Sequence, residues 1–344
     1  MANNGIAGYL GGSVTELDAG TGRLVKVLQG PRYEFVGPDA VASDGSHVWV
    51  ANGGGYPGSV NELDAATGTL VRVIKGPGYR FNSPLAAVSD GSHAWVLSDG
   101  IGHGSVTELD AATGTLVTVV KGPGYQFNIP TAIASDGTHV WVANGGIRVG
   151  HGSVTELNAA TGRLVKVLKG SHYQFNGPAA LASDGTHVWV ASNGANDGVP
   201  SVTELDAVTG RLVRVMKGPG YEFNHPAAIA SDGRHVWVTN SNSVTELDAV
   251  TGGLVRVIEG PRYQFKNSAG VASDGTHVWV ANSGGPAGIG SATELNAATG
   301  TLVKVLNVAN YEFAAPAALA SDGTHVWVAN SSGDSVTEFP ASSP

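Results

Sequence analysis

Seven copies of the pattern Ser-Asp-Gly-x-His place three chemically capable residue types within five positions. A serine, an aspartate and a histidine could form a nucleophilic triad, and imidazoles could bind a metal ion. A triad also needs convergent geometry and an oxyanion hole, whereas seven equal copies indicate a structural pattern. We therefore expect each histidine to stabilise the adjacent Asp-Gly turn by a hydrogen bond, without a catalytic role. These histidines are His47, His93, His139, His187, His235, His277 and His325.

Two further histidines, His103 and His151, occupy equivalent places in the sequence Gly-His-Gly-Ser-Val-Thr-Glu-Leu. Packed sheets lie about 10 Å apart, whereas zinc binds each imidazole nitrogen at about 2 Å. Only loops that bend toward each other could share a metal, so we expect solvated loop histidines. The sequence has no cysteine, which removes thiolate ligands and disulfides. We predict no metal site and no cofactor.

Two other polar patterns have simpler explanations. Glu108 and its equivalents are followed, one strand later, by a recurring basic residue such as Arg72 or Lys166. Such pairs predict cross-strand ion pairs at an outer rim, each worth a few tenths of a kcal/mol. Residues 53–58, Gly-Gly-Gly-Tyr-Pro-Gly, match a dinucleotide-binding pattern, but a strand signal follows where that site needs a helix.

The elements that carry these residues are copies of one four-stranded unit. In the copy that starts at Ser135, we predict strands at 132–135, His139–Asn144, 153–157 and 164–168. The Asp-Gly pair between the first two strands is a strong hairpin signal, because both turn residues accept positive φ. Successive Ser-Asp-Gly turns are 46, 46, 48, 48, 42 and 48 residues apart. Units of this size are typical of β-propeller blades.

Counting the strands predicts how the ring closes. The first, second and fourth strands each occur seven times and the third occurs eight times, which makes 29, or four times seven plus one. We therefore expect a seven-bladed all-β propeller with four antiparallel strands per blade. The chain ends share the last blade, and residues 1–344 form a single domain. Of the two terminal third strands, 13–17 and 335–339, we expect the first to be seated.

Aromatic residues mark the expected blade cores. All seven tryptophans lie in second strands, and most tyrosines and phenylalanines form a Tyr-x-Phe pair in the link between blades, as at Tyr125 and Phe127. Because burying such a ring removes about 150–250 Å² from water, we expect these residues to pack between blades. The blade cores are Trp49, Trp95, Trp141, Trp189, Trp237, Trp279 and Trp327.

The copies resemble the bacterial YVTN and NHL-like propeller repeats. The residues that carry this resemblance are the core at Asp136–Asn144, Asp-Gly-Thr-His-Val-Trp-Val-Ala-Asn, and the segment at Ser105–Gly114, Ser-Val-Thr-Glu-Leu-Asp-Ala-Ala-Thr-Gly. The resemblance covers nearly the whole chain and implies a seven-bladed propeller. It does not imply one function, because that superfamily contains binding modules, scaffolds and a few enzymes.

The amino-acid composition limits the kinds of partner and the location that we expect for this protein. With 19 basic and 28 acidic residues, the net charge of −9 argues against nucleic acid. No run of about 18 apolar residues exists, so we expect no membrane span. The first residues lack the basic and apolar parts of a secretory signal, and the sequence is compatible with both a cytoplasmic and an extracellular location in bacteria. We expect a monomer with a minor swapped dimer, because near-identical blades favour exchange between chains.

The copies differ in length at one loop position only. From the tryptophan of the second strand to the serine of the third, the separations are 10, 10, 12, 12, 6, 12 and 8 residues. From that serine to the next Ser-Asp-Gly turn the separation is always 30. Every insertion therefore lies in the loop between the second and third strands, here called the 2–3 loop. Loops on a rigid scaffold commonly carry binding residues.

The irregular polar residues on that face are our candidate ligand-binding residues: Tyr56, Asp99, His103, Arg148, His151, Asn196, Asp197 and His225. We expect a non-catalytic scaffold that presents this face to a protein, a peptide or a glycan. One alternative is a lyase or hydrolase at the mouth of the central channel, around Asp99, His103, His151 and His225. Another is a structural or engineered repeat without a ligand.

Overall fold

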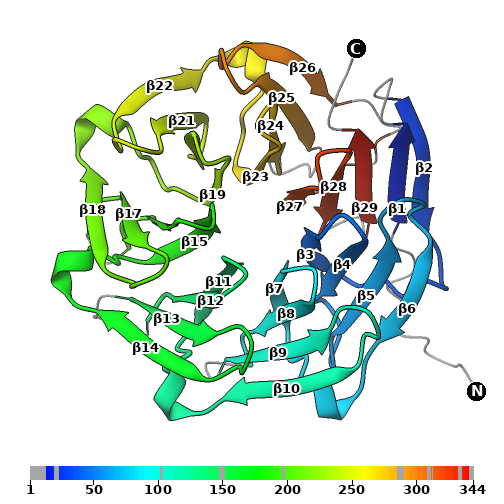
Figure 1. Ribbon diagram of the computed structural model, residues 1–344. Helices are drawn as coiled ribbons and strands as arrows, with labels where there is room; N and C mark the ends of the chain where they lie inside the picture. Colours follow the sequence, from blue (N-terminus) through cyan, green and yellow to red (C-terminus); the bar gives the residue numbers. More distant parts are fainter. Residues whose placement is uncertain are drawn as a thin grey trace, which may run out of the picture.

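The chain forms a β-propeller, a ring of sheets around a central channel (Figure 1). The computed structural model describes residues 13–18, 23–100, 104–146, 152–195, 198–284, 290–307, 311, 313–331 and 335–340. Six sheets are four-stranded and antiparallel, and we number them blades I to VI along the chain, from β3–β6 to β23–β26. The strands at the two ends of the chain form one five-stranded sheet, here called the closure sheet.

In each blade the four strands are numbered outward from the central channel in chain order. The innermost first strands are β3 (Pro38–Ser43), β7 (Pro84–Ser89), β11 (Pro130–Ser135), β15 (Pro178–Ser183), β19 (Ala228–Ser231), β23 (Ser268–Ser273) and β27 (Pro316–Ser321). The second strands are β4 (His47–Asn52), β8 (His93–Ser98), β12 (His139–Asn144), β16 (His187–Ser192), β20 (His235–Thr239), β24 (His277–Asn282) and β28 (His325–Asn330).

The third strands of the blades are β5 (Ser59–Asp64), β9 (Ser105–Asp110), β13 (Ser153–Asn158), β17 (Ser201–Asp206), β21 (Ser243–Asp248) and β25 (Ser291–Asn296). The outer fourth strands are β6 (Leu70–Ile74), β10 (Leu116–Lys121), β14 (Leu164–Lys169), β18 (Leu212–Lys217), β22 (Leu254–Glu259) and β26 (Leu302–Leu306). The closure sheet adds β1 (Ser13–Asp18), β2 (Arg23–Gln29) and β29 (Ser335–Pro340) to β27 and β28.

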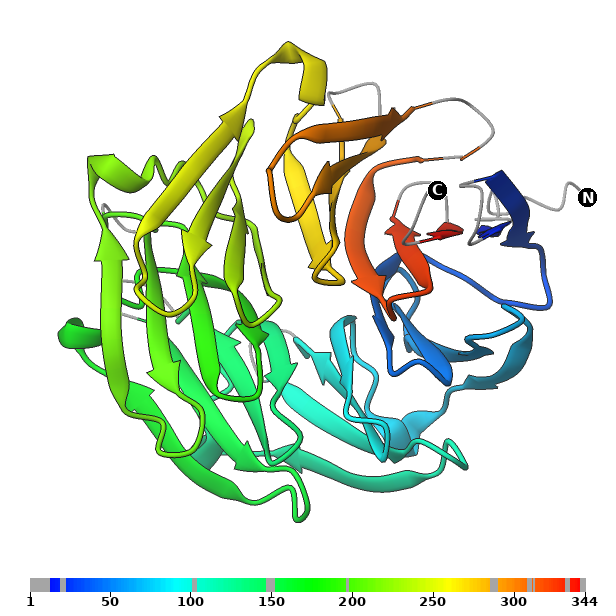
Figure 2. The ribbon, with the colours of Figure 1, turned by 45° about the horizontal axis from the view of Figure 1, so that its top comes forward.

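The prediction of seven blades with four antiparallel strands each is wrong. Among the described residues, six sheets have that form, and the other strands make a five-stranded sheet that contains a parallel pairing. The extra strand in the sequence count is the reason, because it is retained in the ring instead of being left outside it. The blades follow one another in chain order around the channel. The strands β1 and β2 at the start of the chain lie beside the strands at its end (Figure 2).

The expectation that the N-terminal third strand is seated in the last blade is also wrong. β29 pairs with β28 in six antiparallel residue pairs, from Asn330 with Ser335 to His325 with Pro340. β1 pairs with β2 along its length and runs parallel to β29 at two residue pairs. A single pair joins β2 to β29. The C-terminal copy therefore takes the regular position, and the N-terminal copy is added beside it.

The links between the fourth strand and the next first strand, here called the 4–1 links, contain short 3-10 turns. These are η1 (Pro77–Tyr79), η2 (Pro123–Tyr125), η3 (Ser171–Tyr173), η4 (Pro219–Tyr221) and η5 (Pro261–Tyr263). In each, the tyrosine stacks on the phenylalanine two residues later, with ring centroids 5.0 Å apart for Tyr173 and Phe175. No helix among the described residues is long and apolar enough to pass through a bilayer.

The cores lie between neighbouring sheets, as the aromatic pattern predicts. All seven tryptophan side chains are completely buried, six of them in the six blades and Trp327 in the closure sheet. Trp141 of blade III packs in one cluster with Val188 and Val190 on β16 of blade IV. Hydrogen bonds also connect a blade with the 4–1 link before it. Thr155 Oγ1 of blade III donates to the carbonyl of Tyr125, in the link that follows blade II, at 2.7 Å. Each sheet is therefore stabilised on both faces by its neighbours.

Candidate functional site on the top face

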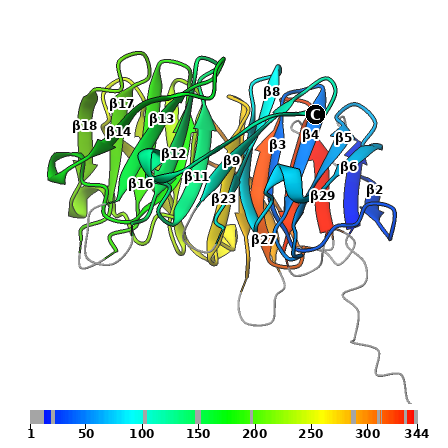
Figure 3. The ribbon, with the colours of Figure 1, turned by 90° about the horizontal axis from the view of Figure 1, so that it is seen from below.

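The strands run between the two faces of a disc, seen edge-on in Figure 3. Because the strands of a blade alternate in direction, the 2–3 loops and the 4–1 links share one face, here called the top face. The Ser-Asp-Gly turns and the turns between third and fourth strands share the opposite face, here called the bottom face.

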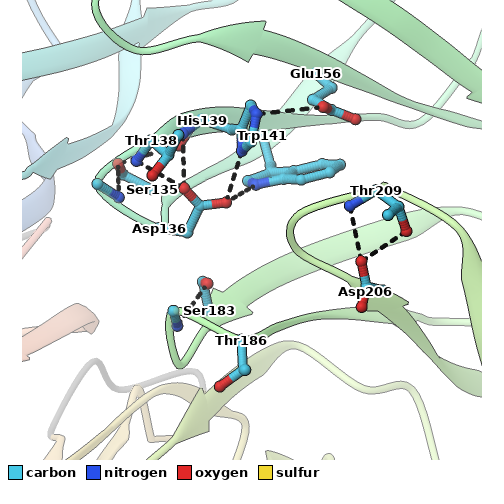
Figure 4. A network of polar contacts seen from close by, with 12 residues as sticks. Ser135, Asp136, Thr138, His139, Trp141, Glu156, Ser183, Thr186, Asp206 and Thr209 are labelled. Carbon is cyan, nitrogen blue, oxygen red and sulfur yellow. Dashed lines mark hydrogen bonds and ion pairs between the residues drawn. The ribbon is translucent and has the colours of Figure 1, made fainter.

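The Ser-Asp-Gly-x-His residues on the bottom face stabilise their own turns (Figure 4). Asp136 Oδ1 accepts the backbone N–H groups of Thr138 and His139 at 2.7 and 2.6 Å. The carboxylate also accepts from Trp141 Nε1 at 2.9 Å and lies 3.2 Å from His139 Nδ1. The predicted turn-stabilising contact of the histidine is thus confirmed in this copy. The aspartate contributes most of the hydrogen bonds.

A catalytic triad has no geometric support in this network. Ser135 Oγ donates to the carbonyl of His139 at 3.2 Å and accepts from the N–H of Gly137 at 3.1 Å. The imidazole of His139 lies between Asp136 and Glu156, with Nε2 3.7 Å from Glu156 Oε1. The serine hydroxyl and the imidazole therefore contact different groups, and the hydroxyl lacks a general base.

The first strands line a central cavity of about 310 Å³ toward the bottom face. It continues into a mouth of about 500 Å³ lined by Ser-Asp-Gly turns, including Asp44 and Asp232. Burial raises the pKa of both carboxyls, but backbone hydrogen bonds from His47 and His235 and the other polar contacts outweigh it and lower each pKa below its usual value. Among the described residues, no three metal-ligating side chains come together.

Three of the eight predicted site residues are described, and they lie on three different blades. Tyr56 is at the tip of the blade I 2–3 loop and is 82% exposed. Asp99 follows β8 of blade II and is half-buried, and His225 is exposed in the 4–1 link that enters blade V. No hydrogen bond or ion pair between any two of these three is found. The other five lie outside the described residues: His103, Arg148, His151, Asn196 and Asp197.

Asp99 and His225 differ in their surroundings. The backbone N–H of Asp99 donates to the carbonyl of Ser83 at 3.3 Å, and its Oδ1 is buried without a hydrogen-bond partner. The ring Nδ1 of His225 lies 2.8 Å from Asn224 Oδ1. His225 also has a positive φ of 51°, as do the equivalent residues of all the other 4–1 links, which include Gly37 and Ile129.

Ile129 is expected to be a strained residue whose replacement by glycine stabilises the protein. Its φ of 51° is unfavourable for a β-branched side chain by about 1–2 kcal/mol, and the side chain is 43% exposed. After allowance for the greater freedom of unfolded glycine, Ile129→Gly should raise the free energy of unfolding by about 0.5–1 kcal/mol. Urea denaturation followed by circular dichroism measures this difference.

The matched control is Gly177→Ile in the next link. Gly177 has a φ of 65°, and a Cβ atom there would lie 2.5 Å from Asn193 Oδ1. This variant should be less stable than the parent. If Ile129→Gly were also less stable than the parent, the assignment of strain to Ile129 would be wrong.

Sequence reasoning missed a cleft on the top face beside Tyr56, here called the blade I cleft. Its volume is about 320 Å³, and its lining includes Val36, Pro57 and the ion pair of Glu34 with Lys75. Lys75 Nζ lies 2.5 Å from Glu34 Oε2 across the rim. Residues 52 and 58–59 of blade I line the cleft, together with Glu34 and Val36 from the link that leaves the closure sheet. A sequence signal existed, because Tyr56-Pro57 has no counterpart in the other 2–3 loops.

A second missed residue is Asp39, at the top of the channel. Burial raises the pKa of this carboxyl. The equivalent Thr131 donates its hydroxyl to the carbonyl of Pro178 in the next blade at 2.7 Å. Asp39 Oδ2 and the carbonyl of Pro84 both lie within 2.7 Å of the place that a Cβ on Gly53 would take. Because one of these two groups is backbone, only glycine fits at position 53 opposite Asp39.

Comparisons with known proteins support the fold. No model of a known protein family matches the sequence, and no curated protein matches it. Hydrazine synthase of Kuenenia stuttgartiensis is similar in structure, with a TM-score of 0.67 and 19% identity over 91% of this chain and 97% of that chain. BamB from Moraxella catarrhalis is similar with a TM-score of 0.55 and 17% identity over 95% of this chain and 90% of that chain. At these identities the likeness shows the β-propeller fold alone.

Proposed function

We propose that this chain is a binding protein that holds a segment of a partner polypeptide in the blade I cleft. The observation that carries this proposal is that Tyr56 is 82% exposed and stands in the chain between Gly55 and Pro57, two residues that line an apolar cleft. Tyrosine is among the residues that contribute most to protein interfaces, because its ring buries a large area and its hydroxyl forms a hydrogen bond. A general binding or scaffold role agrees with the propeller fold.

The chemistry of the cleft favours a peptide as the ligand. Its volume of about 320 Å³ is sufficient for a few side chains, and Val36 and Pro57 offer an apolar lining. Glu34 and Lys75 place opposite charges at one rim, where they can pair with the charged side chains of a polypeptide. Three further expectations belong to this proposal as predictions. They are the resemblance to YVTN and NHL-like repeats, the organisation of residues 1–344 as a single domain, and the roles of the other seven candidate residues.

A peptide-display selection on the immobilised parent protein tests the proposal. We expect enriched peptides whose affinity falls about tenfold or more in Tyr56→Ala, as is typical of a hot-spot tyrosine. Replacing residues 53–58 by the short Ser241-Asn242 loop of blade V should abolish binding, because it removes the cleft wall. Val250→Ala is the control, since Val250 is 74% exposed in a turn of the bottom face.

The results of this selection distinguish a correct proposal from a wrong one. Peptides that bind the parent and Val250→Ala equally, and lose affinity in Tyr56→Ala, support the proposal. A selection that enriches no peptide, or enriched peptides that bind Tyr56→Ala as tightly as the parent, would overturn it.

A further inference from the structure

A buried ion pair repeats at the boundaries between blades. In five blades a glutamate of the third strand contacts a basic residue of the fourth strand, with nitrogen–oxygen distances of 2.8–3.3 Å. The pairs are Glu62–Arg72, Glu156–Lys166, Glu204–Arg214, Glu246–Arg256 and Glu294–Lys304. The expected cross-strand ion pairs are confirmed, but their glutamate side chains are at most 1% exposed, so the pairs are more buried than weak surface pairs.

The basic group also reaches the next blade. Arg214 Nη2 of blade IV donates to the carbonyl of Val250 in the turn between the third and fourth strands of blade V at 2.9 Å. Lys166 and Arg256 donate to the carbonyls of Thr209 and Thr299, one position later in the corresponding turns. Lys166, Arg214 and Arg256 are thus each surrounded by one buried carboxylate and by one or more backbone carbonyls from the neighbouring turn.

Blade II lacks this cation. Thr118 stands directly opposite Glu108 in the strand pairing, where the other blades have arginine or lysine. Glu108 is nevertheless 2% exposed. His93 Nε2, 3.6 Å from Glu108 Oε1, is the one basic group found within ion-pair distance among the described residues. Burial raises the pKa of Glu108, and Asp90 adds to this effect while His93 opposes it.

The turn of blade III has not moved closer to Glu108 in the absence of the cation, and the methyl group of Thr118 lies beside it. A Cβ placed on Gly162, in the adjacent turn of blade III, would lie 3.3 Å from Glu108 Oε2. The corresponding distances are 3.0 Å from Gly114 to Glu62 and 2.6 Å from Gly210 to Glu156, where the cation is present. Among the described residues, no side chain donates to the carbonyls of Ala160 and Thr161, the equivalents of Val208 and Thr209.

We propose that Glu108 and the carbonyls of Ala160 and Thr161 form a binding site for a guanidinium or primary ammonium group, here called the Glu108 site. Arginine and lysine occupy the equivalent place in five other blades, so a glutamate in this position accepts both groups. A buried carboxylate without a cation is costly, and a bound cation with charge-assisted hydrogen bonds offsets that cost. The cation comes from a free amine or guanidine, or from a side chain of a partner polypeptide. This site does not depend on the blade I cleft.

The first experiment titrates methylguanidinium into the full chain at millimolar concentrations, with the side-chain carboxyl signal of Glu108 observed by ¹³C NMR. We expect saturable binding at one site. Glu108→Gln should weaken binding about tenfold or more, as expected for loss of an ionic hydrogen bond. Thr118→Arg should abolish binding, because the tethered guanidinium fills the site, whereas Thr118→Ser should bind like the parent. Circular dichroism verifies that each variant is folded.

The second experiment removes the basic residue of blade I, so that blade I resembles blade II. Arg72→Thr removes the cation that contacts Glu62 at 3.0 Å, so this variant should bind two methylguanidinium ions where the parent binds one. A stoichiometry of two supports the assignment of the site to the missing basic residue. A stoichiometry of one in Arg72→Thr, no saturable binding to the parent, or unchanged binding in Thr118→Arg would overturn the proposal.

A third arm distinguishes the sources of the cation. The probe is a capped pentapeptide with one central arginine flanked by glycines. Binding about tenfold tighter than methylguanidinium supports a polypeptide side chain as the ligand, because flanking backbone adds contacts. Equal affinities support a free small cation. Failure of both probes to bind would overturn the Glu108 site.

Discussion

Replacing Trp189 by alanine should lower the free energy of unfolding by about 3–5 kcal/mol. The indole is completely buried between blades IV and V, where it packs with Ile229, Val236 and Val238 of the next blade. Alanine would leave a cavity at this boundary, because the two sheets are held apart by the other residues of the cluster. Urea denaturation followed by circular dichroism measures the change.

Val208→Ala is the control for this prediction. Val208 is also in blade IV but is 75% exposed in the turn between β17 and β18, so its truncation should change the free energy of unfolding by less than about 0.5 kcal/mol. An equal and small effect in both variants would show that Trp189 does not hold the two blades together.

Removing both terminal third strands should unfold the protein, whereas removing either one should not. β29 pairs with β28, and β1 runs parallel to β29 and pairs with β2. If residues 335–344 are deleted, β1 can pair with β28 without reversing direction, and its sequence from Ser13 to Glu16 is the same as that of Ser335 to Glu338. If residues 1–18 are deleted, β29 keeps its place beside β28.

The double deletion leaves no third strand for the closure sheet, and one edge of β28 then loses its partner. The buried residues Trp327 and Val328 lie on this strand. The expected loss is about 5 kcal/mol or more, comparable to the whole stability of many domains. Thermal unfolding followed by circular dichroism compares the three truncations with the parent. Loss of cooperative unfolding in the 335–344 deletion alone would show that β1 cannot replace β29.

The sequence predicted the repeating unit well because its signals are local. Turn residues such as Asp136 and Gly137, the period-two pattern of the second strand, and the recurring tryptophan each depend on a few neighbouring positions. The predicted strand His139–Asn144 is observed with the same bounds. The first strand begins two residues earlier than predicted, because Pro130 pairs with Asn144 before a bulge.

The errors concern contacts between units. A strand count cannot show whether the ring excludes or retains an extra strand, since β1 and β29 carry nearly the same residues. The burial of Glu156 is likewise invisible within its own copy, because the turn of the next blade covers it. The blade I cleft was missed for the same reason, as the link from the closure sheet provides Glu34 and Val36. Of the candidate residues, Tyr56 lies beside that cleft.

The sameness of the contacts between sheets has a consequence for the gene. The joints between blades III and IV and between blades IV and V are made by the same tryptophan and valine positions, so a blade with these residues does not distinguish its present neighbour from a similar one. Unequal recombination between near-identical coding units would add or remove a whole unit, and a new joint between two such units would be made by the same residues. Only the curvature of the circle, and not the chemistry of any joint, would then select the number of units that persists in a lineage.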